Sequence, residues 1–377
     1  MSLLHTPKLV ASFACAAALS CSSPPATSVV PNDVVVVPTP SATVSQLPEA
    51  PPPPAEPFML APVKIAMGNL VVTPSHVYWL ELRFRGAKRP RTGALPSARG
   101  LLGFGAVLMC DDAGGALMRV DRKSGLKETV AELEYRPFSL AYDGKRLYWT
   151  GAPCTGRPAR SDDPEWLWSW DTTKGGEPMP LGDRDRNYLD MVTTPGAAYV
   201  SDRFGKGGAF RFVDGGKPEA IVPETEQPWV VAVDERSFFW SDRSWNLWET
   251  DVQTKKATKH GSLGDMPSDA HLFEGGLVIR TSSEVLVLSR PTMTIEKRIK
   301  LESYGDRGDG ALAEGRYYLW ADGTDRISRL DLTTGALTVA ATSAAQEACG
   351  VAFDKGTLFW IDRKKNAIFG WPSPPFR

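Results

Sequence analysis

The chain has 377 residues, of which 42% are hydrophobic and 10% aromatic, and its formal net charge is −1. This length is enough for two ordinary domains or one large all-β domain, and the apolar content is enough for a sizeable core. The near-zero charge excludes a global field that would steer the chain to nucleic acid or an anionic membrane, although local basic patches are compatible with it. We therefore expect no nucleic-acid partner.

The N-terminal residues have the pattern of an export signal rather than of a folded element. The apolar run over 9–19 is too short to span a bilayer. It leads into Leu-Ser-Cys at 19–21, which resembles the lipobox of bacterial lipoproteins, apart from Ala18 where that family usually has leucine. The resemblance implies that residues 1–21 are a lipoprotein signal, that Cys21 is acylated, and that the protein is an outer-membrane lipoprotein on the periplasmic or cell-surface side. Ordinary signal cleavage nearby is the alternative, and both predict export.

Residues 22–61 are rich in proline and in small or polar residues. Such a segment cannot bury enough apolar surface to offset the entropy of ordering it, so we expect a disordered linker. Proline keeps such a chain extended. The segment could be a stalk that lifts the following domain, at 62–377, away from a membrane, or only a spacer.

The remaining chain repeats with a period near 40 residues. Runs such as LYWTG, FFWSD, YLWAD and LFWID recur, and the aligned position falls at 79, 109, 149, 200, 240, 279, 320 and 360. Five of these seven gaps lie within one residue of forty. A fixed period of this length is the sequence signature of repeat architectures.

Each repeat contains four short apolar runs separated by turn residues. An aspartate ends the third run and suits the first position of a type I turn. Four strands at intervals of about ten residues predict an antiparallel four-stranded blade, and several blades predict an all-β propeller. The aspartates in question are Asp121, Asp171, Asp214, Asp251 and Asp331.

The aromatic runs are read as the second strands of the blades. Because neighbouring blades pack on both faces of such a strand, the run is continuously apolar rather than alternating, and large rings fill the wedge between blades. The repeated motifs resemble the YWTD repeats of lipoprotein-receptor and TolB-like propellers. That resemblance covers about 310 residues and implies a fold but no function.

The ends of the repeat region predict ring closure. The last repeat stops after its third run, at 367–372, and the strand-like residues 62–67 have no place in the first repeat. We expect 62–67 to supply the missing fourth strand, which removes an open sheet edge. The first gap of 30 residues is too short for a blade, so seven blades with an insertion in the first are expected, with eight as the alternative.

Two long loops between second and third strands are strongly basic. Loops of this length in a compact domain are often functional or disordered. We expect them to form a basic patch for an anionic partner, while a solvated loop without a partner is the alternative. The candidate residues are Arg83, Arg85, Lys88, Arg89 and Arg91 in the first loop, and Arg157 and Arg160 in the second.

Aromatic residues at the loops between blades are a second candidate surface. Trp229 and Trp245 could form stacking platforms for sugars, or they could pack the rim. In a propeller, the loops after the second and fourth strands share one face, and ligands usually meet that face or the central channel.

Acidic motifs give little support for catalysis or metal binding. The segment DRDRN at 183–187 has calcium-loop spacing, but its arginines oppose a cation and it lacks the glycine and bidentate glutamate of an EF-hand, so a charged turn is expected. Acids recurring after the second strand are better explained by the blade's own turn than by a catalytic ring. They are Asp202, Asp242, Asp322 and Asp362. No cofactor, metal site or catalytic residue is predicted.

Three cysteines remain after the signal. Cys110 and Cys154 fall at equivalent places in adjacent repeats and could form a disulfide in an oxidising compartment. Cys349 would be left over, buried near a first strand.

Taken together, these patterns favour an envelope-anchored, monomeric and non-catalytic scaffold that binds a protein or polysaccharide through its loop face. The alternative of a different class is a periplasmic hydrolase or lyase that uses acidic residues at the channel. A non-repeating cluster of acids or histidines at the channel mouth would favour the enzyme, and a basic or aromatic rim would favour the scaffold.

Overall fold

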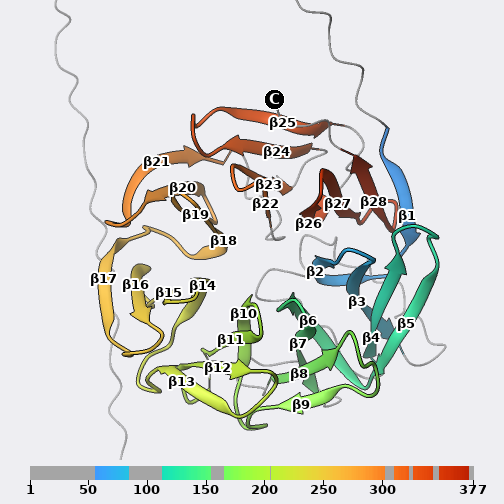
Figure 1. Ribbon diagram of the computed structural model, residues 1–377, viewed down its shortest axis with the longest axis horizontal. Helices are drawn as coiled ribbons and strands as arrows, with labels where there is room; N and C mark the ends of the chain where they lie inside the picture. The colour runs from blue at the N-terminus through green and yellow to red at the C-terminus, as the bar shows by residue number, and fades with distance from the viewer. Residues whose placement is uncertain are drawn as a thin grey trace, which may run out of the picture. The chain divides into compact units, whose positions relative to one another are not determined.

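A computed structural model describes residues 56–84, 113–153, 165–203, 205–301, 310–321, 326–342 and 348–372 of the chain. These residues form 28 β-strands. No helix long and apolar enough to cross a membrane is found among them. The strands pair into seven four-stranded antiparallel sheets arranged around a central axis (Figure 1), so the seven-bladed propeller is confirmed.

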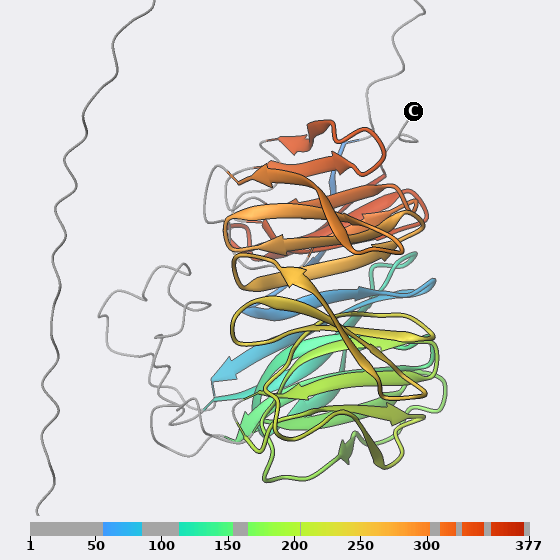
Figure 2. The same ribbon diagram turned by 90° about the vertical axis from the view of Figure 1, so that its left-hand side faces the viewer.

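Blades 1 to 7 follow one another along the chain, and each begins at the axis and ends at the outside. Figure 2 shows the ring edge-on, with the strands running across its thickness. Blade 1 comprises β2 (Ala66–Val72), β3 (His76–Phe84), β4 (Ala113–Asp121) and β5 (Lys127–Leu133). Blade 2 comprises β6 (Tyr135–Tyr142), β7 (Arg146–Pro153), β8 (Trp166–Asp171) and β9 (Met179–Leu181). Blade 3 comprises β10 (Tyr188–Thr194), β11 (Ala197–Asp202), β12 (Ala209–Val213) and β13 (Pro218–Val222).

Blades 4 to 6 have the same order of strands, and blade 7 takes its outer strand from the beginning of the domain. The strands are β14 (Trp229–Val233), β15 (Ser237–Ser241), β16 (Asn246–Asp251), β17 (Ala257–Ser262); β18 (Pro267–Phe273), β19 (Gly276–Thr281), β20 (Glu284–Ser289), β21 (Thr294–Lys300); β22 (Ala311–Ala313), β23 (Tyr317–Ala321), β24 (Arg326–Asp331), β25 (Leu337–Thr342); and β26 (Ala348–Asp354), β27 (Thr357–Asp362), β28 (Ala367–Pro372), β1 (Phe58–Pro62).

An N-terminal strand closes the ring, but it lies upstream of the expected position. The closing strand β1 pairs antiparallel with β28, with Phe58 opposite Gly370 and Pro62 opposite Ala367. Residues 66 and 67, expected in that strand, instead begin β2 at the axis. The intervening residues carry the chain from the outer edge of blade 7 to the inner edge of blade 1. A strand therefore occupies 58–61, which the sequence assigned to the linker.

The short first gap of the repeat is explained by an insertion within blade 1. Strands β3 and β4 pair along their full length, from His76 opposite Asp121 to Phe84 opposite Ala113. The connection between them, residues 85–112, includes the apolar run counted as a second repeat and lies outside the described residues. Seven blades and not eight result.

The second strands are buried on both faces, as their continuous apolar pattern predicts. All six residues of β11 and of β19 are buried. The tryptophans of these strands have at most 3% of their surface exposed, and they are Trp79, Trp149, Trp240, Trp320 and Trp360. Truncating such a side chain to alanine typically costs about 3–5 kcal/mol of stability.

Hydrophobic clusters join each blade to the next. Between blades 2 and 3, Tyr148 and Leu167 pack with Val200 and Phe212. Each aromatic second strand therefore contributes to a core that two blades share, and the ring is held together by these interfaces rather than by one central core.

The aspartates that end the third strands cap the following turns. Asp121, Asp171, Asp251 and Asp331 each accept hydrogen bonds from the backbone N–H groups two and three residues later, at 2.7–3.1 Å. Asp214 differs, because it and Gly215 have φ values of 49° and 71°. Two successive positive φ values belong to a type I′ turn, for which Asp-Gly is a favoured pair.

Candidate functional site

The loop face carries the connections that follow the second and the fourth strand of each blade. Its recurring acids serve their own turns, as expected. Asp202 accepts hydrogen bonds from the N–H groups of Gly205 at 2.8 Å and Lys206 at 3.1 Å. Asp242 and Asp362 bind their turns in the same way, and Asp322 lies outside the described residues.

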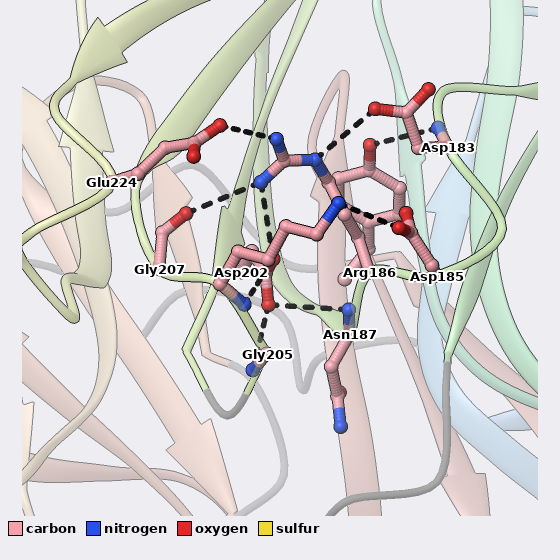
Figure 3. A network of polar contacts seen from close by, with 10 residues as sticks. Asp183, Asp185, Arg186, Asn187, Asp202, Gly205, Gly207 and Glu224 are labelled. Atoms are coloured by element: carbon pink, nitrogen blue, oxygen red, sulfur yellow. Dashed lines mark hydrogen bonds and ion pairs between the residues drawn. The ribbon is translucent and has the colours of Figure 1, made fainter.

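The DRDRN segment forms an ion-pair network on this face, with a buried Arg186–Asp202 pair at its centre (Figure 3). The guanidinium of Arg186 lies 3.3 Å from Asp202 and 3.4 Å from Asp183, and it also pairs with Glu224. Its Nη1 donates to the carbonyl of Gly207 at 3.4 Å. Arg186 thus lies among these acids and pairs with them, which is the arrangement expected of a charged turn.

This network joins three connections of the loop face. Asp183 and Arg186 lie between β9 and β10, Asp202 ends β11, and Glu224 lies between β13 and β14. The side chain of Asp202 has no exposed surface and that of Arg186 is 8% exposed. Removing one member of such a buried pair leaves an uncompensated charge, so the network is a strong local constraint on these loops.

Next to this network, an arginine and two tryptophans pack together. The guanidinium of Arg203, which directly follows Asp202, lies over the ring of Trp229 at 3.2 Å from its centroid. The ring of Trp229 meets Trp245 edge-on, with centroids 5.3 Å apart and an interplanar angle of 74°. The structure therefore brings together the two tryptophans that the sequence singled out and adds a cation to them.

Beneath Arg203 lies the carboxylate of Asp190. Nη1 of Arg203 is 3.1 Å from Oδ2 of Asp190, and the hydroxyl of Ser201 lies 3.4 Å from the same oxygen. Asp190 is placed by a β-bulge, because the register of β10 against β11 shifts between Tyr188 and Met191. Burial raises the pKa of Asp190, and Arg203 and Ser201 oppose that rise.

A second acid, the half-buried Glu165, completes the group. Its Oε2 atom is buried and accepts no hydrogen bond from the described residues. Burial raises the pKa of Glu165 to about 8, the charges of Arg136 and Arg203 oppose the rise, and the charge of Asp190 adds to it. A carboxyl group that titrates near neutral pH is typical of functional sites.

We call Arg136, Glu165, Asp190, Arg203 and Trp229 the mouth cluster. Arg136, Asp190 and Trp229 belong to β6, β10 and β14, the inner strands of three consecutive blades. Inner strands surround the central axis (Figure 1). Arg136 and Trp229 stand at the starts of β6 and β14, which follow connections on the loop face. The cluster therefore lies at the loop-face ends of these inner strands.

A different polar group bridges blades 5 and 6. Asp269 accepts hydrogen bonds from the hydroxyl of Tyr318 at 2.7 Å and from the N–H of Gly310 at 2.9 Å, and Nε2 of His271 lies 3.3 Å away. Burial would raise the pKa of Asp269, but His271, Arg280 and Tyr318 hold it below its ordinary value. Its carboxylate is thus charged and well bonded, as befits a structural link between blades.

The remaining predicted residues are either internally engaged or outside the described parts. Arg83 pairs with Glu132, donates to the hydroxyl of Thr129 at 3.2 Å and is 28% exposed. Cys349 is 2% exposed, in the hydrophobic cluster that contains Trp79. The predicted residues outside the described parts are Cys21, Arg85, Lys88, Arg89, Arg91, Cys110, Cys154, Arg157 and Arg160.

Within the described ranges, no group of three or more His, Cys, Asp or Glu side chains is arranged to hold a metal ion. The residues that sequence reasoning missed are Arg136, Glu165, Asp190 and Arg203. No recurrence through the blades distinguishes any of these four residues from other charged residues, so the 40-residue period gave no signal for them. The one usable signal was a charged residue, Asp190, inside an inner strand.

Comparisons with known proteins agree on the fold alone. No protein-family model matches the chain, and no curated protein matches it. Selenomethionine-substituted virginiamycin B lyase from Staphylococcus aureus superposes with a TM-score of 0.55 at 12% identity, over 81% of this chain and 94% of that one.

Two further solved structures give the same result. A catalytically inactive virginiamycin B lyase from Staphylococcus aureus with quinupristin has a TM-score of 0.56 at 10% identity, over 85% of this chain and 99% of that chain. The β-propeller domain of Cps50 (Swd1) from Myceliophteria thermophila has a TM-score of 0.50 at 10% identity, over 83% and 100%. The chain is thus a seven-bladed β-propeller, a fold shared by proteins of unlike function.

Proposed function

We propose that this protein is an envelope-anchored binding scaffold whose loop face takes a protein or polysaccharide partner at the mouth cluster. The observation that supports this most is the set formed by Arg203, Trp229 and Trp245, a cation and two rings on the loop face. Tryptophan and arginine are the side chains most often found at the centres of binding surfaces. The adjoining Arg186 network keeps the supporting loops in place.

Partner retention by tryptophan variants tests this proposal. The full chain, tagged and cross-linked in native envelope fractions, is compared with Trp229→Ala, Trp245→Ala and the control Trp371→Ala. Trp371 lies near the end of β28 and is also partly exposed, but it is toward the opposite face, opposite Leu358 near the start of β27. We expect at least tenfold loss of a partner with the first two variants and retention with the control. Equal retention by all three would reject the site.

The anchor and the basic loops belong to the same proposal. We propose that Cys21 carries the lipid and that the proline-rich segment tethers the propeller to the outer membrane. Cys21→Ser should abolish labelling by an alkyne fatty acid and release the protein from the membrane fraction. Persistent labelling would contradict acylation at this cysteine.

We propose that the basic loops widen the binding surface for an anionic part of the partner. Replacing Arg85, Lys88, Arg89 and Arg91 with serine should weaken binding, and more so at low salt, because exposed charges are screened by salt. Arg83 is left unchanged, since it already pairs with Glu132. Salt-independent binding by both forms would remove these loops from the proposal.

A second candidate is a hydrolase or lyase, and Glu165 is the observation that favours it. A carboxyl group with a pKa of about 8 beside a second acid, Asp190, resembles the arrangement of an acid–base pair. Quinupristin, the compound bound to one of the similar folds, and an acidic polysaccharide are suitable first substrates. A new chromatographic product that Glu165→Gln fails to form would support the enzyme.

A further inference from the structure

Glu165 has a carboxylate oxygen without a hydrogen-bond partner, and Nε of the neighbouring Arg136 is a buried donor in the same state. The backbone of Glu165 is fixed, since its carbonyl accepts the N–H of Tyr188 at 2.9 Å. Its Oε2 is nevertheless buried without a hydrogen bond from the described residues. Native proteins rarely leave a buried polar atom in this state, and each such case calls for an explanation. A ligand that donates a hydrogen bond would supply the missing contact.

The charges around Glu165 favour an uncharged donor. The charged groups facing it are Arg136 from β6, Asp190 from β10 and Arg203 from the end of β11. A cationic ligand would be repelled by the two guanidinium groups, and an anionic ligand by the carboxylate of Asp190. Arg203 is already engaged by Asp190 and Trp229. Arg136 lies over the ring of Phe138 at 4.3 Å from its centroid, and the buried Nε of Arg136 has no hydrogen-bond partner among the described residues, so a ligand there needs an acceptor as well as a donor. A hydroxyl group carries no net charge, so neither the guanidinium groups nor the carboxylate of Asp190 repels it.

The tryptophans beside the acid supply the other half of a sugar site. The half-buried rings of Trp229 and Trp245 meet edge-on, and Arg203, whose charge acts on Glu165, lies over Trp229. Such rings pair an apolar body with a polar edge and suit ligands that have both C–H faces and hydroxyl groups. Ligand sites in general fix a ligand with a few polar groups on an otherwise apolar lining.

We propose that the mouth cluster binds the uncharged, hydroxyl-bearing end of a glycan, one of whose hydroxyls donates a hydrogen bond to Oε2 of Glu165. This inference rests on the proposed binding function and names its ligand class. It also couples the site to pH. A hydrogen bond to the ionised form of an acid favours that form, so the ligand lowers the pKa of Glu165 from about 8.

The sign of the coupling follows directly. At pH 7 the free protein holds the proton on Glu165, and the bound protein holds it less, so binding releases a proton. Affinity therefore rises as the pH increases from 6 to 9. If the ligand lowers the pKa by about one unit, the affinity rises about tenfold over that range.

The test uses chitotriose, an uncharged oligosaccharide, and trigalacturonate, an acidic one, titrated calorimetrically into the full chain at pH 6, 7.5 and 9. Buffers of different ionisation enthalpy report the number of protons released. Glu165→Gln is compared with wild type, with Glu235→Gln as the matched control because Glu235 is exposed between β14 and β15, on the opposite face.

We expect chitotriose to bind more tightly at pH 9 than at pH 6 in wild type and in Glu235→Gln, with proton release, and to bind Glu165→Gln without pH dependence. The same pH dependence in Glu165→Gln would overturn the role of Glu165 while leaving the binding function intact. Binding of trigalacturonate alone, or of neither sugar, would overturn the ligand class. Unaltered chitotriose affinity in Trp229→Ala would instead count against the proposed site itself.

Discussion

Two neighbouring regions of the loop face, the Arg186 network and the mouth cluster, are built from the same residue types but differ in how their polar atoms are used. Arg186 binds three carboxylates and a carbonyl. In the mouth cluster, Glu165 keeps a buried oxygen without a partner among the described residues. The first arrangement is closed and stabilises the fold, whereas the second is open to a ligand.

The largest effect should follow from breaking the closed network. Arg186→Met leaves Asp202 charged and without exposed surface, so the free energy of unfolding should fall by about 3–5 kcal/mol. Urea unfolding at pH 7 measures this change. The control is Lys206→Met, which breaks a surface pair with Asp185 and should leave the unfolding midpoint unchanged. If Arg186→Met and Lys206→Met lowered the free energy of unfolding equally, the Arg186 network would contribute no more to stability than an exposed ion pair does.

The open cluster should reveal itself through the pH dependence of stability. The folded state keeps the proton of Glu165 up to about pH 8, whereas the unfolded state loses it near pH 4.5. Because the folded state binds more protons between these values, the free energy of unfolding should fall by on the order of 2–4 kcal/mol as the pH rises through this window.

Glu165→Gln removes that contribution, so the variant should exceed wild type in stability at pH 8 and lose the advantage toward pH 4.5. Urea unfolding across this range gives the difference, with Glu235→Gln as the reference. A difference between Glu165→Gln and wild type that stays constant with pH would mean that Glu165 is ionised throughout and the cluster is closed.

A smaller effect should follow at the bridge between blades 5 and 6. Tyr318→Phe removes the hydroxyl that binds Asp269 and leaves the carboxylate with the N–H of Gly310 and with His271. We expect a loss of about 1.5–3 kcal/mol in the free energy of unfolding, as is usual for a hydrogen bond to a charged group. Thermal or urea unfolding at pH 7 measures this loss. An unchanged free energy of unfolding would mean that the hydrogen bond between Tyr318 and Asp269 contributes no more than a surface contact does.

The repeated parts of the molecule could be predicted from the sequence because the same physics recurs in each blade. A tryptophan buried between blades and an aspartate capping a turn leave their marks every forty residues. The closing strand was misplaced by four residues, because 58–62 and 62–67 are both short apolar runs next to proline. Only pairing with β28 distinguishes them.

The mouth cluster could be predicted only in part, because ring closure and not chain proximity assembles it. Trp229 and Trp245 were visible as large rings in loop positions. Glu165 stood out in no way as the last residue of a long polar loop, and Arg203 belongs to an Asp-Arg pair that also occurs at 242–243 and 362–363. Their roles depend on burial, which the residue types alone do not express.

The most direct test of the account is a carboxyl-carbon NMR titration of the glutamate-labelled protein, with and without chitotriose. The account predicts one glutamate resonance that titrates near pH 8, is missing in Glu165→Gln, and titrates at lower pH when chitotriose is added. If every glutamate titrates below pH 6, Glu165 is not the open acceptor described here and the mouth cluster is a closed structural network like that of Arg186.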